Sequence, residues 1–319
     1  MSSSRRTKYN IKYRHQMDTI DTMDKKHMLL KLDNLLEGEI IKRPSKYIKT
    51  PYVADIKIVD EIIDNSLDVN KTILGHSASL GCCGLADVGA HVLIGRAPPK
   101  KNTLKTREKL SCEYRVYLSI FREKDQEMII GIYPKLAEKL VESALKNNML
   151  TRLINVKSYK PETSIYVEGL VDSRFDFSGI DQNGIPFIME VKNVPLADYE
   201  DMTAKERKKM SFDGRVINSK VAYFPDGYRK KQTDTVSPRA LKHISELTLI
   251  KRQSKTRCIM CYVIQRTDVD RFQPSVIDPE YRAAFIEAVK AGVEIITMVI
   301  KWTRTGEAYF IRDDLPVNI

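Results

Sequence analysis

Two acidic side chains and one lysine near the middle of the chain have the types and spacing that phosphodiester chemistry requires. Asp176 lies in the strand-like run 174–177, and Glu190 and Lys192 end a second, apolar run, 186–192. Carboxylate oxygens are ligands that Mg²⁺ and Mn²⁺ prefer, and a bound divalent cation can activate a water against a phosphodiester. A lysine beside them can offset the negative charge that builds on the phosphate. We therefore expect a metal-dependent site if the two runs lie side by side.

The two runs are predicted to form a hairpin. They are separated by Asn183-Gly184, the dipeptide best suited to the positive φ angles of a tight turn. Strand side chains alternate between faces, so Phe175 and Phe177 should share one face and Asp176 should lie on the other. The polar side chains that end the second run share a face by the same rule. If the polar faces coincide, the carboxylates and the ammonium meet beside an apolar core.

An acidic residue two positions before a lysine is a weak signal by itself. The same pattern occurs at 24–26, 55–57 and 206–208, in a chain of which 30% of the residues are charged. Surface ion pairs explain most such patterns. The triplet at Glu190 differs because it ends an apolar strand and follows a hairpin that supplies a second acid. This context places a catalytic role on equal terms with a surface ion pair.

The composition favours a polyanionic partner and excludes membrane insertion by a helix. The 319 residues include 53 Lys and Arg against 42 Asp and Glu, a net charge of +11. Such a balance suits nucleic acid, although many basic proteins bind none. The chain has neither an apolar run of about 18 residues nor a signal-peptide core, which predicts a soluble, intracellular protein without a membrane partner. The compartment and the oligomeric state stay open.

The five cysteines are odd in number and irregularly spaced, which argues against a disulfide framework. Cys258 and Cys261 lie in a run that is predicted to be a buried strand. Three positions apart on a strand, they face opposite ways, so we expect buried thiols rather than a metal or redox pair. Cys82 and Cys83 with His76 lack a fourth ligand at zinc-site spacing.

The first third of the chain is predicted to hold an extension and a small barrel. Residues 1–35 are basic and predicted to be flexible, and residues 36–104 carry the short strands and glycines of an OB-like β-barrel. Basic and aromatic side chains interleave there and are predicted to contact phosphates and stack on bases; a solvated rim is the alternative. The predicted barrel strands are 38–42, 52–59, 72–76 and 90–95. The candidate nucleic-acid-binding residues are Arg43, Lys46, Tyr47 and Lys49.

Residues 105–319 follow the order helix, three strands, helix, strand between Pro134 and Gln265. Proline fits the first turn of both helices, and Ser237 is the predicted N-cap of the second. The charged segment 198–220 is predicted to be a solvated loop, with a nucleic-acid-contacting insertion as the alternative. The other predicted elements are strands at 128–133, 164–168, 258–265, 293–301 and 308–311, and a helix from Asp278-Pro279 to Gly292.

This order, with an acid on the second strand and acid-x-Lys on the third, resembles the core of the PD-(D/E)xK nuclease superfamily. Short sequence motifs, found in the same order along the chain, also resemble those of the sugar fermentation stimulation protein (SfsA) family, over about residues 36–319. These motifs are SRFDF (173–177), MEVKNV (189–194), FPD (224–226), KHISEL (242–247), VIQR (263–266) and AGVEI (291–295). The resemblance implies an α/β (α+β) protein, in which an N-terminal OB-like barrel precedes a PD-(D/E)xK nuclease-like αβββαβ domain.

The resemblance also implies DNA binding, with RNA as a second candidate. Carried over by position, Asp176 and Glu190 would be ligands of Mg²⁺ or Mn²⁺, and Lys192 would position or activate the attacking water. Four further residues are candidates for the same cleft: Glu168, Asp226, Lys242 and Gln265. Their structural alternatives are, in that order, a strand-end ion pair, a turn-stabilising acid, a solvated helix lysine and a strand-end polar cap.

Two interpretations of the function follow. The favoured one is a DNA-binding protein with a metal-dependent deoxyribonuclease site, in which the barrel holds the substrate. The alternative is a non-catalytic DNA-binding regulator that uses the nuclease-like fold as a scaffold, because a fold alone does not establish an activity. A metabolic enzyme is disfavoured, since no phosphate-cradling glycine loop or dinucleotide fingerprint is present. The N-terminal extension and the 198–220 insert depart from the family's compact pattern and leave the substrate preference open.

Overall fold

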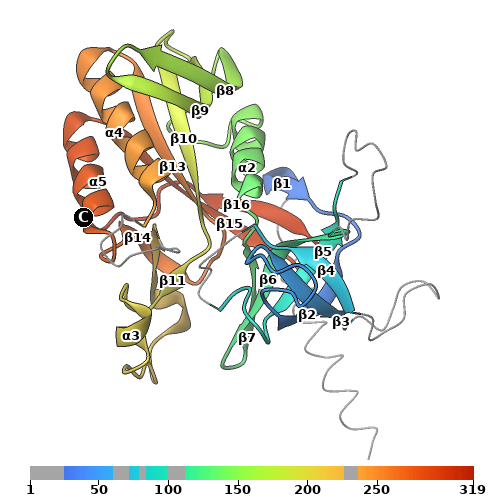
Figure 1. The fold of residues 1–319 in the computed structure, drawn as a ribbon. Coiled ribbons are helices and arrows are strands. Elements are labelled where there is room, and N and C mark those ends of the chain that lie inside the picture. The colour runs from blue at the N-terminus through green and yellow to red at the C-terminus, as the bar shows by residue number, and fades with distance from the viewer. Residues whose placement is uncertain (1–24, 60–71, 79–83, 99–111, 226–235) are drawn as a thin grey trace, which may run out of the picture.

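The described residues form three β-sheets, and helices cover the largest of them (Figure 1). The computed structural model describes residues 25–59, 72–78, 84–98, 112–225 and 236–319. The strands are β1 (Met28–Lys31), β2 (Leu36–Lys42), β3 (Val53–Ile58), β4 (Thr72–His76), β5 (His91–Arg96), β6 (Tyr114–Glu123), β7 (Gln126–Gly131), β8 (Ser158–Val167), β9 (Val171–Ile180), β10 (Pro186–Val194), β11 (Ala197–Asp198), β12 (Lys220–Phe224), β13 (Arg257–Ile264), β14 (Val269–Pro274), β15 (Glu294–Trp302) and β16 (Glu307–Arg312). The helices are η1 (Lys25–His27), α2 (Lys135–Lys146), α3 (Ala204–Arg207), η2 (Ile217–Ser219), α4 (Pro238–Gln253) and α5 (Pro279–Ala291).

The N-terminal unit is a small barrel with the strand order β4-β3-β2-β5-β6-β7. Sequential neighbours in this order are antiparallel, and an additional parallel pairing of β4 with β6 closes the ring. Apolar side chains from alternate strand positions fill the interior, among them Ile40, Ile56, Ile94 and Val116. A closed ring of five short strands is the architecture of an OB-like barrel, so this prediction is confirmed.

The barrel sheet continues beyond residue 104, where the predicted barrel ends. β6 completes the ring and β7 extends the sheet to Gly131. Strand β6 was not predicted from the sequence, although Tyr114, Val116 and Leu118 are buried at alternate positions with half-exposed residues between them. That period of two is the signal of a half-buried strand.

The C-terminal unit is built on a seven-stranded sheet in the order β1-β16-β15-β13-β10-β9-β8. β10, β13 and β15 are parallel, and β9 is antiparallel to β10. Helix α2 covers one face of the sheet, and α4 and α5 cover the other (Figure 1). Along β13, Ile259 packs toward α2 and Met260 packs toward α4 and α5. The succession α2, β8, β9, β10, α4, β13 confirms the predicted αβββαβ order, with β11, α3, η2 and β12 inserted before α4.

The two strand cysteines lie as their spacing predicts. Cys258 packs on the α4 side of the sheet and Cys261 on the α2 side, and neither is in a disulfide. Burial raises the pKa of the Cys258 thiol to about 12, and burial also raises the pKa of Cys261. Both are therefore core thiols. Cys82 and Cys83 lie outside the described residues.

Part of the predicted flexible extension is a strand. Met28–Lys31 forms β1, which pairs antiparallel with β16. Leu29 is buried, and its carbonyl accepts a 2.8 Å hydrogen bond from Ser143 Oγ of α2. The apolar run at the start of β1 can add to the edge of the sheet, which is why this segment is ordered. Residues 1–24 lie outside the described part.

The charged insert is exposed or half-exposed over most of its length, as predicted, but it contains the short elements α3 and η2 and is not a loop throughout. Lys220 at its end is an exception. This lysine is 2% exposed, and its Nζ donates hydrogen bonds to Glu123 at 2.5 Å and to Asp268 at 2.6 Å. A buried ammonium requires such partners. The hydrogen bond to Glu123 therefore fixes the end of the insert to the β6–β7 hairpin of the barrel.

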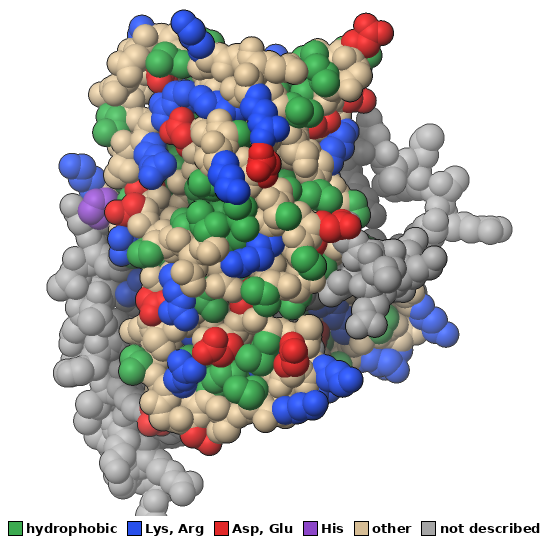
Figure 2. All heavy atoms as spheres, turned by 90° about the vertical axis from the view of Figure 1, so that its left-hand side faces the viewer, with side chains coloured by type: hydrophobic (Ala, Val, Ile, Leu, Met, Phe, Trp, Pro, Cys, Tyr) green, Lys and Arg blue, Asp and Glu red, His purple; other side chains and the backbone are tan. Residues whose placement is uncertain are grey.

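In the part of the chain that the structure describes, none of the helices is long and apolar enough to cross a membrane. Figure 2 shows the side of the molecule that carries α4 and α5. Lys and Arg side chains are interspersed there with acidic and apolar ones. Among the described residues seen in that view, the basic side chains do not form a continuous band.

Candidate active site

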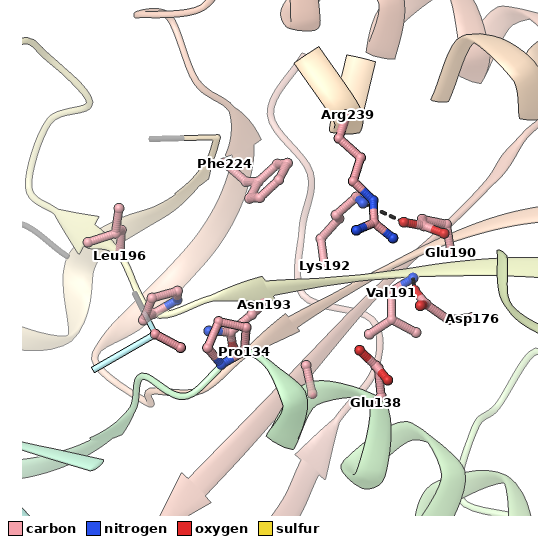
Figure 3. A pocket seen from close by; sticks show the side chains of 13 residues that line it. Pro134, Glu138, Asp176, Glu190, Val191, Lys192, Asn193, Leu196, Phe224 and Arg239 are labelled. Carbon is pink, nitrogen blue, oxygen red and sulfur yellow. Dashed lines mark hydrogen bonds and ion pairs between the residues drawn. The ribbon is translucent and has the colours of Figure 1, made fainter. Parts of the chain in front are cut away.

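A cavity of about 370 Å³ opens where β10, the first turn of α2 and the start of α4 meet (Figure 3). We call it the pocket. Asp176, Glu190 and Lys192 all line it. In Figure 3, Glu138 points from α2 toward Asp176, and Arg239 points from α4 toward Glu190 and Lys192. The structure thus brings the predicted carboxylates and ammonium together, and it adds a third acid and a guanidinium.

Asp176 lies where β9 and β10 separate. The backbone pairing of these strands ends at Phe177, which is opposite Met189. Beyond this point the Asp176 side chain replaces a strand contact, because its Oδ2 accepts a 2.7 Å hydrogen bond from the backbone N–H of Val191. The carboxylate therefore has a fixed position at the mouth of the fork between the strands.

Phe175 and Phe177 do not share a face, so the predicted alternation is wrong at this point. Phe177 packs toward α2, whereas Phe175 packs toward α4, with its ring centroid 5.7 Å from that of His243. The change of face occurs at Asp176. The neighbouring strand β8 is irregular at the same level, where Glu162 has a φ of 50°. Irregularities of this kind re-aim side chains next to functional sites.

The carboxyl group of Asp176 is hard to ionise in the metal-free protein. Its pKa is raised from the usual 3.8 to about 7, first by burial and then by the charge of Glu190, against the opposing effects of the Val191 N–H and of Lys192. Burial also raises the pKa of Glu138. Neighbouring acids with raised pKa values mark a position where a cation would be stabilised.

Glu190 is 2% exposed and is held through one of its two oxygens. Its Oε1 accepts a 2.5 Å hydrogen bond from Lys192 Nζ and a second, short one from His243 Nδ1. Burial raises the pKa of Glu190, but the His243 hydrogen bond and the Lys192 charge outweigh burial and hold it below the usual value. Its other oxygen, Oε2, is buried and has no hydrogen-bond partner among the described residues.

The candidate lysine of α4 lies outside the pocket, and its neighbour in the sequence lies at the site. Lys242 Nζ donates to Asp172 O at 2.5 Å and lies 3.7 Å from Glu246. His243 is buried beside Glu190 and was not singled out as a site residue. The signal for it was present, because position 243 recurs at three-and-four spacing with the buried positions 240 and 247.

Two other pocket residues were also not predicted. Glu138 is the acidic residue in the first turn of α2, where glutamate is common because it favours the helix dipole. Arg239 follows the proline that begins α4. Neither position differs in sequence from an ordinary helix start, so only the fold identifies them.

Gln265 joins the two units of the protein and does not line the pocket. It is fully buried, its Nε2 donates to Asn193 Oδ1, and its Oε1 accepts from Trp302 Nε1 at 2.8 Å. Gly131 of the barrel donates to its carbonyl at 3.2 Å, and a Cβ at Gly131 would lie 1.9 Å from Gln265 Oε1. These contacts match the strand-end polar role.

Of the remaining candidates, Glu168 and the barrel residues do not line the pocket. Glu168 is exposed in the turn between β8 and β9, and Asp226 lies outside the described residues. The four candidate nucleic-acid-binding residues lie together in the loop between β2 and β3 of the barrel. Arg43 donates there to Pro51 O at 2.8 Å and to Ala86 O at 2.9 Å. Lys46, Tyr47 and Lys49 are exposed, and the Nζ of Lys46 lies 4.8 Å from the ring centroid of Tyr47.

The donor set of the pocket fits a hard divalent cation. Carboxylate oxygens are the ligands of Mg²⁺, Mn²⁺ and Ca²⁺, and Mg²⁺ sites often use only one or two carboxylates with substrate phosphates and waters. Asp176 and Glu190 provide two carboxylates, and the partnerless Oε2 of Glu190 is an available donor. No group of three or more His, Cys, Asp or Glu side chains forms a ready-made site among the described residues. The pocket therefore suits a metal shared with a substrate more than a closed structural metal site.

The fold is similar to that of a solved protein. The structure of SfsA from Pyrococcus furiosus in complex with Ca²⁺ superposes with a TM-score of 0.63 at 19% identity, over 92% of this chain and 99% of that one. This likeness covers both the barrel and the domain built on the seven-stranded sheet.

Sequence comparisons give the family. The profile of the sugar fermentation stimulation protein RE domain matches residues 208–306. A sugar fermentation stimulation protein homolog of Jannaschia sp. (strain CCS1) is 31% identical over 73% of this chain and 80% of the relative. Another, of Prochlorococcus marinus (strain MIT 9301), is 27% identical over 83% and 89%. Together with the sequence motifs and the fold described above, these matches show that the chain belongs to the sugar fermentation stimulation protein (SfsA) family.

Proposed function

We propose that this chain binds DNA and hydrolyses its phosphodiester bonds with Mg²⁺ or Mn²⁺ at Asp176 and Glu190. The observation that carries the proposal is the pocket, where two carboxylates from separating strands meet Lys192. The fold, the net charge of +11 and the Ca²⁺ complex of the P. furiosus relative support it. A bound divalent cation supplies an activated water and neutralises phosphate charge.

Each pocket residue has a distinct role in this proposal. Asp176 and Glu190 hold the cation through oxygens. Lys192 donates a hydrogen bond to a phosphate oxygen and offsets the charge that develops there. Arg239, whose guanidinium points into the pocket, adds positive charge at the side from which a phosphate would enter. The raised pKa of Asp176 fits a group that ionises fully when a cation takes the place of its proton.

We expect the wild-type chain to cleave DNA in the presence of Mn²⁺ and not in EDTA. Supercoiled, linear and single-stranded DNA are incubated with the purified protein and separated on gels. Conversion of supercoiled to nicked or linear DNA would show internal cleavage, and comparison with the linear and single-stranded substrates would show whether ends or single strands are preferred. Asp176→Asn protein prepared in parallel controls for a contaminating nuclease. Salt-dependent binding of DNA without any cleavage would reject the catalytic part and favour the scaffold interpretation.

We expect the β2–β3 loop of the barrel to supply much of the affinity for DNA. Reversing the charge of Arg43 and Lys46 to Glu should weaken binding similarly for unrelated sequences, because phosphate contacts carry no base information. The slope of log K against log salt should become shallower by about 0.9 for each phosphate that the variant no longer neutralises. Fluorescence anisotropy across a salt series measures both quantities.

The matched control is Lys290→Glu, which reverses an exposed charge on α5. Arg43 also holds its own loop through two carbonyls, so the melting temperature of each variant must be compared with wild type. An equal loss of affinity in the control would show a general charge effect rather than a binding loop.

A further inference from the structure

His243 is a buried polar side chain that the proposed chemistry does not yet use. It lies on α4, is 4% exposed, and packs its ring beside Phe175. Its Nδ1 donates to Glu190 Oε1. We assign the hydrogen to this nitrogen because the facing Oε1, which also accepts from Lys192 Nζ, acts as an acceptor.

The hydrogen bonds of Glu190 are divided unequally between its two oxygens. Oε1 has two donors, His243 from α4 and Lys192 from two positions along the same strand. Oε2 is buried without a partner among the described residues. One oxygen is therefore held from two elements, and the other is left for a ligand that the protein itself does not provide.

Lys192 and His243 differ in how easily each can break its hydrogen bond to Glu190 Oε1. Lys192 is on a flexible stem and lines the pocket, so it can turn toward a substrate phosphate, and its hydrogen bond to Glu190 Oε1 weakens as it does so. A buried carboxylate that loses its only donor pays a large desolvation cost. His243 does not line the pocket, and its ring is confined between the helix and Phe175, so its hydrogen bond persists when Lys192 turns away.

We propose that His243 is a positioning residue: it holds Glu190 Oε1 from α4, which orients Oε2 toward a bound metal ion and frees Lys192 for the substrate phosphate. This inference rests on the proposed metal site at Asp176 and Glu190. Partners that orient metal-ligating side chains in other proteins typically contribute about 10- to 100-fold to metal affinity. His243 acts through Glu190 and contacts neither the metal nor the substrate.

The test measures Mn²⁺ affinity of the full chain by calorimetry, without DNA. His243→Asn places an amide N–H near the position of Nδ1 and should bind Mn²⁺ with nearly wild-type affinity. His243→Gln places its amide near Nε2 instead, and His243→Leu has no donor; both should weaken Mn²⁺ binding by about 10- to 100-fold. His91→Asn is the matched control, because His91 Nδ1 pairs with Glu37 of the barrel at 2.9 Å, away from the pocket.

A merely structural histidine would give a different pattern. His243→Gln would then lower the melting temperature yet bind Mn²⁺ as tightly as wild type, and this result overturns the inference. The comparison of Asn with Gln keeps the test valid even where His243→Leu fails to fold. The double variant Lys192→Met/His243→Gln should lose more affinity than the two single losses combined, because Glu190 Oε1 then has no donor. Additive losses would show that the two donors do not share this task.

The same titration separates failure of this inference from failure of the proposed function. Wild-type protein that binds Mn²⁺, loses it with Asp176→Asn and keeps it with both His243→Gln and His243→Leu refutes only the role of His243. Wild-type protein that binds no Mn²⁺ refutes the metal site and, with it, this inference.

Discussion

Asp176→Asn and Glu190→Gln should each lower DNA cleavage by at least about 10²–10³-fold, the loss that follows removal of one charge-stabilising group from an active site. Both substitutions keep the shape of the side chain and remove the charge that holds a cation. Cleavage is measured under single-turnover conditions with Mn²⁺, and metal binding by calorimetry. Affinity for DNA without metal should stay equal or rise, because a negative charge that repels phosphate has been removed. Wild-type-like metal binding in both variants would contradict the assignment of these two ligands.

The effect of Asp176→Asn on stability should be opposite to its effect on activity. The pKa of Asp176 is about 7 in the folded protein and near 3.8 in the unfolded chain. Between these values the unfolded chain has released the proton that the fold retains, so this group makes stability fall as pH rises from about 4 to about 7. Without metal, the Asn variant should therefore melt at an equal or higher temperature than wild type above pH 7. A structural carboxylate would instead give a lower melting temperature and unchanged cleavage.

Lys192→Met should abolish most cleavage, by about 10²-fold or more, while metal binding is retained. Lysine is not a ligand of a hard cation, and Glu190 keeps its hydrogen bond from His243 when the ammonium is gone. The phosphate, however, loses the donor that offsets its developing charge. Single-turnover cleavage and Mn²⁺ calorimetry on the same preparation measure the two quantities separately.

The matched control for this variant is Lys242→Met, which removes a lysine that lies outside the pocket and contacts Asp172 O and Glu246. Its cleavage rate should equal that of wild type. If Lys192→Met cleaves as fast as the control, the ammonium has only a structural role beside Glu190.

Much of the fold could be predicted because local signals agree with the tertiary structure. Asn183-Gly184 predicts the hairpin turn, and Gly184 has a φ of 83°. Asp278 caps α5 through a hydrogen bond from Tyr281 N, and Gly292 ends that helix with a φ of 92°. The apolar runs that predict strands lie in the sheets, where pairing with neighbouring strands buries their side chains.

The details of the site depend on long-range geometry that the sequence does not display. Strand alternation predicts regular faces, but the fork between β9 and β10 and the irregular Glu162 change the face at Asp176. The family resemblance makes Lys242 a candidate, whereas the helical periodicity of α4 identifies the buried position of His243. Glu138 comes near Asp176 only because α2 packs across β10, so that segments far apart in the chain meet.

The pairing of β1 with β16 has a consequence for how this chain is made. Leu30 lies beside Ala308, so the first strand of the large sheet meets its partner only after nearly the whole chain has been synthesised, at about 5–20 residues per second on a ribosome. The barrel contains only β2–β7 and can close while the later part is still being translated. The large sheet cannot, because its order requires β15 and β16 from the C-terminal part of the chain. The pocket, built on that sheet and lined by residues as late as Arg239, can therefore be completed only after all the barrel strands have been made.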